Sequence, residues 1–288
     1  MKRTTANTSS VGELDNAAIG ELLAREAENA NGHLRQAFKR AARRAFLWPE
    51  EAVALLAANR SLTELHGVGP FIAKLVVQWI ESPPADIEVP EIRREFLTMA
   101  QARKVLSENP RWQKALKGDL QMHTSGSDGT GTVSEMAEAA IERGYEFISI
   151  TDHTKGLPIA NGMNESRLEQ QRKEIDALNA DFRTQRTNFT VLRSAEVNLS
   201  PLGAADMDAK TLRRLDVVLG AFHSALRRTE DQTERYLAAL RNPLIHILGH
   251  PQTRIYNHRL GLQADWHRLF GEAARLNKAV EIDGYADR

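Results

Sequence analysis

The chain has 288 residues, of which 42% are hydrophobic and 26% are charged, a composition that suits about two packed domains with charged surfaces. It has no cysteine, which excludes disulfides, thiolate metal ligands and cysteine nucleophiles, and we expect a reducing, cytoplasmic setting. The 38 basic and 38 acidic residues balance, so any nucleic-acid contact must come from a local basic patch rather than from overall charge.

The first residues predict neither a secretory signal nor a membrane segment. The start MKRTTANTSS is basic but lacks an apolar core. No run approaches the roughly 18 apolar residues that a membrane span needs, so we expect no membrane partner. Residues 1–12 are small and polar and predict a disordered tail.

Residues 13–82 predict a small all-α domain. The stretch IGELLAREAENANGHLRQAFKRAARRAFLW has apolar residues three and four positions apart, with an interruption near Asn31 and Gly32. SLTELHGVGPFIAKLVVQWI then predicts two short helices joined by a turn at Gly67, Val68 and Gly69. Glycines allow another backbone to come close, and the amides that open the second helix can bind a phosphate. A tight turn used only for packing is the alternative.

A basic run precedes this turn and contains no acid. Its members are Arg35, Lys39, Arg40, Arg43 and Arg44. The spacings 35/39/43 and 40/44 place these cations along two adjoining rows of one helix. Such a face suits a phosphate backbone, although an ordinary solvated helix face has the same pattern.

Residues 83–117 predict a linker followed by a helix. SPPADIEVP (82–90) breaks the helical pattern, and EIRREFLTMAQARKVLSENPRWQKALKG is mostly helical and charged. We interpret this stretch as a spacer.

From Asp119 onward the pattern alternates between short apolar runs and amphipathic segments such as VSEMAEAAIERG and ESRLEQQRKEIDALNADFR. The runs are DLQMH (119–123), YEFISIT (145–151), FTVLRSAEV (189–197), LDVVLGAFHS (215–224), LIHILGH (244–250) and AVEIDGY (279–285). This alternation favours an α/β fold with parallel strands, arranged as an open sheet or as a barrel.

Residue types that bind metals gather where these runs end, and parallel α/β folds build their sites at the carboxyl ends of strands. In chain order they are Gln121, His123, Asp128, Asp152, His153, Glu196, His223 and His250. Any one of them alone is more often an ordinary surface or core residue. Together, charged groups at the ends of buried strands cost several kcal/mol unless they are paired or bind a metal. We therefore predict a site for Zn²⁺, Mn²⁺ or Fe²⁺, the ions that imidazole and carboxylate ligands suit.

Three further histidines do not fit this pattern. His246 lies inside the fifth run and is interpreted as structural, whereas His258 and His267 are interpreted as ordinary loop and helix residues.

The motifs DLQMHTSGSDGTGTVSEMAEAAIERGYEFISITDH, SAEV, VVLGAFHS, ILGHPQTR and VEIDG resemble those of the polymerase-and-histidinol-phosphatase (PHP) family. They are most similar to the PHP domain of bacterial family X DNA polymerases. The resemblance extends over residues 118–288, and it implies a distorted (β/α)7 barrel that hydrolyses phosphoesters with up to three divalent ions. By this resemblance Glu196 bridges two ions, and His223 and His250 complete the site of one of them. The remaining ligands are His123 at the second ion and Asp128 and His153 at the third.

The chain departs from the family pattern at two places. The first motif normally has two histidines, and the first of them is replaced here by Gln121, an amide that coordinates weakly. The last motif, Asp-x-His, is not reached before Arg288, so only the position formed by Glu196, His223 and His250 has all its ligands. We expect the chain to be a fragment of a longer protein; an open barrel with an impaired site is the alternative.

For catalysis, the resemblance implies a metal-bound water as the attacking group. Asp152 is predicted to support a ligand histidine from behind. Lys155 and Arg254 follow ligand-bearing runs and are predicted to hold the substrate phosphate, with solvated loop cations as the alternative.

Residues 16–82 are similar to the small N-terminal domain of family X polymerases, and the glycine turn resembles a helix-hairpin-helix, which binds the DNA backbone without sequence specificity. The residues assigned to DNA are Gly67, Val68, Gly69, Lys74, Arg40 and Arg44. In our alignment Leu75 occupies the position of the family's lyase lysine, so lyase activity is not expected. About 35 residues separate the two similarities, too few for a polymerase palm, and we expect no polymerase activity.

Three functions remain open at this point. The first is a phosphoesterase on nucleic acid, either a 3′ end-processing nuclease or a phosphatase with a role in DNA repair. The second is a small-molecule phosphatase of the histidinol-phosphate type. The third is a DNA-binding protein with a degenerate, inactive barrel, which Gln121 and the missing last motif favour. The sequence does not predict an oligomeric state.

Overall fold

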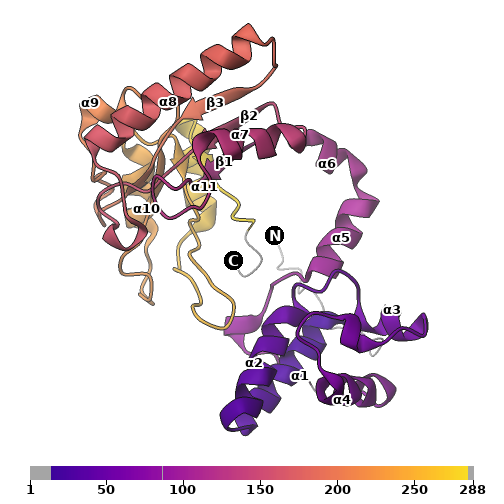
Figure 1. The fold of residues 1–288 in the computed structure, drawn as a ribbon. Coiled ribbons are helices and arrows are strands. Elements are labelled where there is room, and N and C mark those ends of the chain that lie inside the picture. The colour runs from indigo at the N-terminus through magenta and orange to yellow at the C-terminus, as the bar shows by residue number, and fades with distance from the viewer. Residues whose placement is uncertain (1–13, 86, 285–288) are drawn as a thin grey trace. The chain divides into compact units, whose positions relative to one another are not determined.

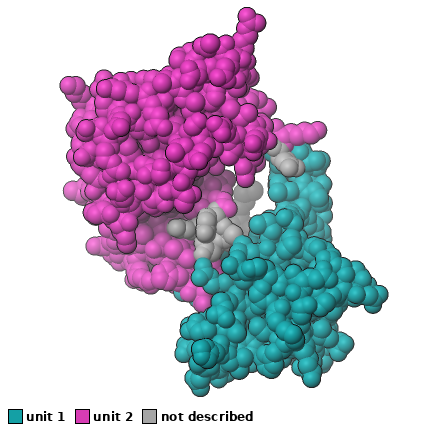
Figure 2. All heavy atoms as spheres, viewed as in Figure 1, with its two compact units in different colours: residues 1–113, 287 teal, residues 114–286, 288 magenta. Residues whose placement is uncertain are grey.

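The computed structural model describes residues 14–85 and 87–284, and the tail predicted at residues 1–12 lies outside them. The chain forms two compact units that divide between Gln113 and Lys114 (Figures 1 and 2). None of the helices in the described residues combines the length and apolar character that crossing a membrane requires.

The first unit is all-α. Its longest helices are α1 (Asn16–Asn29) and α2 (Gly32–Ala45), which pack against each other and are separated at the predicted interruption. The shorter elements are α3 (Ala52–Ala57), the 3₁₀ turn η1 (Leu62–Glu64), α4 (Pro70–Glu81), η2 (Glu91–Arg93), α5 (Met99–Glu108) and α6 (Pro110–Ala115), which extends past the division. Alanine and leucine side chains of α1 and α2 form the core together with Trp48, which is 1% exposed.

The glycine turn differs from its prediction on one side. The segment before it forms only the single 3₁₀ turn η1, and not a helix. The turn begins after Ser61, whose side chain accepts a hydrogen bond from the amide of Thr63. It ends at Leu65, because the backbone of Leu65 is extended and cannot continue a helix. On the other side a helix follows the turn as predicted: α4 begins at Pro70, with Gly69 as its N-cap.

The stretch that follows α4 is bound to the first unit by a buried ion pair. Arg93 in η2 donates from Nε and Nη2 to the two carboxylate oxygens of Glu21 in α1, at 2.7 and 2.8 Å. Arg93 is 7% exposed and Glu21 is 2% exposed, so solvent screens this bidentate contact little. The start of the predicted spacer is therefore packed onto α1 in this unit.

The second unit has alternating strands and helices, as the sequence pattern predicts. Its strands are β1 (Gly118–Met122), β2 (Phe147–Ile150), β3 (Thr190–Arg193), β4 (Glu196–Asn198), β5 (Leu219–Ala221), β6 (Ile247–Leu248) and β7 (Ala279–Val280). They form two parallel sheets, in the order β1-β2-β3 and β4-β5-β6-β7. The structure is thus α/β with parallel strands, and closure into a (β/α)7 barrel stays a prediction.

Helices cover these sheets. The helices of the second unit are α7 (Val133–Glu142), α8 (Glu165–Thr184), α9 (Ala209–Leu212), α10 (Thr233–Arg241) and α11 (Trp266–Arg275), with the 3₁₀ turn η3 (Pro158–Ala160) (Figure 1). Apolar side chains of α7 and α8 pack on β2 and β3, and those of α10 and α11 pack with β4 and β6. The apolar faces of these helices exclude water from the sheets, which leaves the strand ends as the accessible edge.

One predicted strand is divided in two. The run FTVLRSAEV contains β3 and β4, which belong to different sheets and are separated by Ser194 and Ala195. An isolated parallel bridge between His153 and Glu196 connects the sheets at this division. Glu196 is therefore the first residue of a strand, and not the end of one as the sequence analysis assumed.

Candidate metal centre

A buried carboxylate forms the centre of the site. Glu196 is 1% exposed, and its backbone amide donates to the Asp152 carbonyl while its carbonyl accepts from the Thr154 amide. These two bonds align the start of β4 with the segment that follows β2. Glu196 and His153 are therefore neighbours across the two sheets.

Side chains from four strand ends surround this carboxylate. Oε1 of Glu196 is 2.9 Å from Nε2 of His223, which follows β5, and 2.9 Å from Nε2 of His250, which follows β6. Oε2 is 3.3 Å from Nε2 of His123, which follows β1, and 3.7 Å from Nδ1 of His153. The two oxygens therefore face two different pairs of imidazoles.

These atoms define two overlapping ligand groups. One consists of Glu196, His223 and His250, and the other of His123, His153 and Glu196; within each group the candidate ligand atoms lie within 4.8 Å of one another. Three donors at this separation match the protein ligands of a zinc or manganese site that has an open position. Buried nitrogens that make no hydrogen bond to a described residue, Nδ1 of His123 and of His153, agree with this assignment.

The protonation states of Glu196 and His153 suit a cation, whereas the hydrogen bond to Glu196 and the nearby carboxylate charges together outweigh burial and raise the pKa of His123. Burial by itself would raise the pKa of Glu196, but hydrogen bonds from His123, His223 and His250 outweigh it, and the pKa lies well below the ordinary 4.5. Burial lowers the pKa of His153, which keeps this imidazole neutral. An ionised carboxylate beside a neutral imidazole is the state in which both groups bind a metal.

Gln121 in β1 occupies part of the second group. Its Nε2 donates to Oε2 of Glu196 at 2.8 Å, so the amide presents its donor to the carboxylate. An amide bound in this way leaves one fewer lone pair on Oε2 for a cation. The arrangement makes the Oε1 side, with His223 and His250, the better ligand set.

Asp128 lies at the edge of the cluster. Its Oδ2 is 3.7 Å from Nε2 of His153, and its side chain is 47% exposed. It is not part of either compact ligand group, so the pair of Asp128 and His153 is the loosest of the predicted metal positions.

Asp152 has a different set of partners from the one predicted. Its carboxylate is fully buried and accepts hydrogen bonds from the amide and hydroxyl of Thr124, the hydroxyl of Ser127 and the amide of Gln171. These partners are loop and helix residues and not ligand imidazoles, and the support of a ligand histidine by Asp152 stays a prediction. Asp152 fixes the loop after β1, and among the groups that raise the pKa of His123 against the effect of burial it ranks after Glu196 and Asp128.

Two residues that sequence reasoning missed support His223. Oδ1 of Asn198 is 3.1 Å from Nδ1 of His223, and the Asn198 amide donates to Asp206 at 3.1 Å. The same Asp206 carboxylate accepts from the hydroxyl of Thr154 at 2.7 and 2.8 Å and from the amide of Gly156. With a cation between His223 and Glu196, Asn198 would favour the tautomer of His223 that carries its proton on Nδ1 and offers the Nε2 lone pair to the ion.

A third missed residue is Glu281, which directly follows β7. Its carboxylate accepts a hydrogen bond from the backbone amide of His250, and burial raises its pKa above the ordinary 4.5. It lies within the quoted motif VEIDG, so the available signal was a carboxylate directly after an apolar pair. Asn198 and Asp206 gave no such signal, because polar residues in loops are common.

The two predicted phosphate-binding cations lie in different surroundings. Lys155 is exposed and its ammonium is paired with Glu165, which raises the pKa of Lys155. Arg254 is half-buried in the loop that follows β6, four residues after His250. Lys155 lies two residues after His153, but it must exchange Glu165 for a phosphate before it can contribute.

The predicted DNA-binding residues lie together in the first unit. Gly67 has φ +85°, which favours glycine, and Val68 is 6% exposed within the core. Arg40 and Arg44 of α2 and Lys74 of α4 are exposed. A Cβ added to Gly67 would lie 3.3 Å from Cγ of Arg44, so the basic helix and the glycine turn are direct neighbours.

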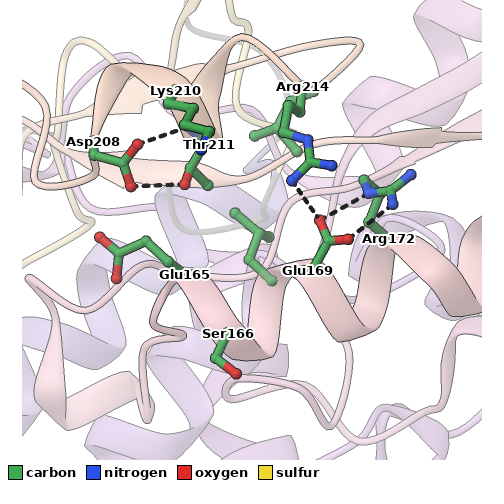
Figure 3. Close-up of a pocket in the computed structure, with 10 residues that line it drawn as sticks. Glu165, Ser166, Glu169, Arg172, Asp208, Lys210, Thr211 and Arg214 are labelled. Carbon is green, nitrogen blue, oxygen red and sulfur yellow. Dashed lines mark hydrogen bonds and ion pairs between the residues drawn. The ribbon is translucent and has the colours of Figure 1, made fainter.

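A surface pocket between α8 and α9 contains charged groups that already bind each other. Arg172 and Arg214 both point at Glu169, at 2.8 and 3.2 Å, and hydrogen bonds from Arg172 lower the pKa of Glu169 to about 2 (Figure 3). Lys210 and Asp208 complete the rim. Since its charges are mutually compensated, this pocket has no group poised for phosphoester chemistry.

Comparison with known proteins agrees with this geometry. The PHP domain family matches residues 119–286, which contain every member of the cluster. The chain belongs to the PHP family. The bacterial "DNA polymerase/3'-5' exonuclease PolX" of Bacillus subtilis is 40% identical over 169 residues, which are 58% of this chain and 29% of that protein.

Relatives named as phosphatases match the same PHP region. A "Probable phosphatase" of Photobacterium profundum is 30% identical over 170 residues, 57% of this chain and 63% of the relative. Another, of Acetivibrio thermocellus, is 32% identical over 141 residues, 46% of this chain and 53% of the relative. The chain thus spans less than two thirds of each of these proteins.

Proposed function

We propose that this PHP protein is a metal-dependent phosphoesterase that acts on nucleic acid, as a 3′ end-processing nuclease or phosphatase without polymerase activity. The observation behind this proposal is the convergence of His123, His223 and His250 on the buried carboxylate of Glu196. Burying such a cluster of charged and polar groups costs free energy, and binding divalent cations would offset that cost.

Two cation positions follow from the ligand groups. Glu196, His223 and His250 would hold one ion, and His123 and His153 would hold a second through the same carboxylate. Divalent ions there, Mn²⁺ or Zn²⁺ by their preference for these ligands, would supply Lewis-acid chemistry and charge neutralisation to a phosphate ester. A third ion at Asp128 and His153 would be the weakest, because the Asp128 side chain is 47% exposed and belongs to neither compact ligand group.

The chain's own residues would then bind and orient the substrate. Arg254, in the loop after β6, would donate in a bidentate manner to phosphate oxygens. Asn198 would keep the imidazole of His223 in one tautomer. Asp206 would hold Asn198 and Thr154 in place through the hydrogen bonds that it accepts from both. These contacts fix the ligand atoms before substrate arrives, which lowers the reorganisation that a reaction requires.

Nucleic acid is favoured as substrate by the first unit. Its exposed cations on α2 contain no acid among them and adjoin the glycine turn, an arrangement suited to the phosphates of a DNA backbone. The printed name of the Bacillus relative pairs polymerase with 3'-5' exonuclease. We extend the exonuclease part of that name to this chain as part of the proposal.

The proposal is tested by replacing one ligand. His223→Ala should abolish manganese-dependent release of nucleotide or phosphate from a 3′-labelled duplex and leave duplex affinity unchanged. His267→Ala, an exposed histidine on α11, is the matched control and should behave as wild type. Unchanged hydrolysis by His223→Ala would refute the assigned site.

A small-molecule phosphatase is the second candidate. The "Probable phosphatase" of Photobacterium profundum is covered over 63% of its length, against 29% for the polymerase relative. Histidinol phosphate, assayed beside the labelled duplex, separates the two candidates. Faster turnover of histidinol phosphate than of the duplex would favour a small-molecule phosphatase over an enzyme that acts on nucleic acid. If neither ester is hydrolysed and no metal binds, the amide of Gln121 at Glu196 would instead indicate an inactive, DNA-binding protein.

A further inference from the structure

An aromatic ring lies exposed at the glycine turn. Phe71, the second residue of α4, is 60% exposed, and its ring centroid lies 6.2 Å from that of Phe38, which is 2% exposed in α2. Phe38 therefore supports one side of the Phe71 ring, while most of Phe71 remains in contact with water. Exposing a large apolar side chain to water costs free energy, and a ligand that covers the ring would remove that cost.

The turn that presents this ring is rigidly held. Nε1 of Trp48, which is 1% exposed, donates to the carbonyl of His66 at 3.1 Å, and the amide of Val68 donates to the carbonyl of Leu65 at 3.1 Å. Val68 is itself buried in the core. Phe71 follows this turn directly, so its backbone position is fixed before any ligand binds.

The surroundings of the ring are cationic. Helix α2 has five basic residues and no acidic one, and a Cβ added to Gly67 in the turn would lie 3.3 Å from Cγ of Arg44. Lys74 lies one turn after Phe71 on α4 and is exposed. Amides at the start of α4 add partial positive charge next to the ring. A ligand with a flat apolar face and repeated negative charges is complementary to this combination.

We propose that Phe71 stacks on an unpaired nucleobase, so that the first unit prefers DNA with a single-stranded end over blunt duplex. Phosphates of the same strand would bind the cations of α2 and Lys74. An unpaired base is required because paired bases within a duplex are already stacked on both faces, whereas an end or overhang offers a free π-face. This inference rests on the proposed function and specifies the form of its substrate.

The experiment compares three DNA probes with the full chain: a blunt duplex, the same duplex with a short 3′ thymine overhang, and that overhang with abasic residues. Wild type should bind the base-containing overhang about tenfold more tightly than either control, the smaller end of the range for one stacked base. Phe71→Ala should lose this preference and bind all three probes with similar affinity. Phe71→Trp should keep it.

A spectroscopic readout separates stacking from general charge attraction. With 2-aminopurine in the overhang, wild type and Phe71→Trp should change its fluorescence on binding, and Phe71→Ala should not. Equal affinity of wild type for all three probes, or an overhang preference that persists in Phe71→Ala, would overturn the proposal. So would a wild-type dimer that Phe71→Ala dissociates in sedimentation, because the ring would then bind a second copy of the chain.

The outcomes also distinguish this inference from the proposed function. If wild type binds none of the probes but hydrolyses p-nitrophenyl phosphate, the nucleic-acid part of the proposed function fails and the stacking proposal fails with it. If wild type binds blunt and overhanging duplex equally and hydrolyses their 3′ ends, only the stacking proposal fails. Thermal unfolding of Phe71→Ala close to wild type confirms that the comparison uses folded protein.

Discussion

The two units place their charged residues in opposite ways. In the second unit, histidines from separate strands turn toward one buried carboxylate, Glu196, and are partly covered. In the first unit, the cations of α2 point outward over an apolar core and are exposed. The first arrangement suits a small, highly charged ligand in a fixed geometry, and the second suits a long polyanion that can be contacted at several points.

This difference has a consequence for sensitivity to mutation. An inward cluster depends on each member, because both compact ligand groups share Glu196 and the removal of one partner leaves other charges buried. An outward row of cations distributes its effect over several side chains, each of which is worth little alone. We therefore expect large, specific losses in the second unit and graded losses in the first.

The largest effect is expected from Glu196→Gln. The substitution removes the negative charge shared by both ligand groups, so metal affinity should collapse and hydrolysis should fall by about 10³-fold or more. Metal content after dialysis and turnover of p-nitrophenyl phosphate measure this, while duplex affinity should stay at the wild-type value. Near-normal metal content in the variant would contradict the inward cluster as the metal centre.

Asn198→Ala should produce the next largest effect. Without its acceptor, Nδ1 of His223 no longer selects one tautomer, and metal affinity should fall about 10- to 100-fold, as for other residues behind metal ligands. Competition with a chelating dye measures the affinity. Asn179→Ala is the matched control: Asn179 bonds the backbone of Val191 and should affect thermal stability without affecting metal affinity.

Gly67→Val tests the outward surface. A β-branched residue is strained at φ +85°, and its Cβ would lie 3.3 Å from Cγ of Arg44, so the turn must shift. Duplex affinity should decrease by about tenfold in a binding titration at fixed salt. Hydrolysis of p-nitrophenyl phosphate should not change, and Gly271→Ala, in open space on α11, should alter neither property. Unaltered duplex binding would make the turn a packing element only.

The smallest effect concerns pH and His246. His246 is exposed as a whole, but partial desolvation of its ring, with a lesser contribution from Lys278, lowers its pKa below the ordinary 6.5, and its Nδ1 accepts from the amide of Val218 at 2.9 Å. The unfolded chain therefore takes up this proton at a higher pH than the folded one. The contribution of His246 to the free energy of unfolding is fully present above pH 6.5 and is lost as the pH falls through the lower pKa of the folded state.

His246→Asn keeps an acceptor that does not titrate in this range. It should reduce the decrease in Tm between about pH 7 and about pH 5 by one or two degrees, roughly the change expected for a single group of this exposure. The control His258→Asn, in an exposed loop, should leave the slope as in wild type. An unchanged slope in His246→Asn would indicate that this imidazole does not contribute to acid sensitivity.

Much of the fold was predictable because its signals are local. The three- and four-residue spacing in IGELLAREAENANGHLRQAFKRAARRAFLW determines two helices, and Gly32 with φ +55° interrupts them where the pattern does. The alternation of apolar runs and amphipathic segments after Asp119 determines parallel strands and covering helices. The histidines and carboxylates at the ends of the apolar runs are what make a metal centre predictable from the sequence.

Other features depended on distant parts of the chain. Periodicity did not reveal that FTVLRSAEV divides into two strands of different sheets, because that division depends on pairing with the segment after β2. The split between η1 and α4 likewise depends on the extended Leu65 and on Trp48 at the turn. In both cases a local pattern was compatible with more than one structure.

The sequence by itself determined which chemical groups this protein has and on which kind of element each lies, since propensity and periodicity act over a few residues. Only the tertiary structure decided which oxygen of Glu196 faces which imidazole, that Gln121 donates to Oε2, and that Asn198 stands behind His223. The physical reason is distance along the chain: His250 and Gln121 are 54 and 75 positions from Glu196, and contacts over such separations are set by strand register and not by neighbouring residues.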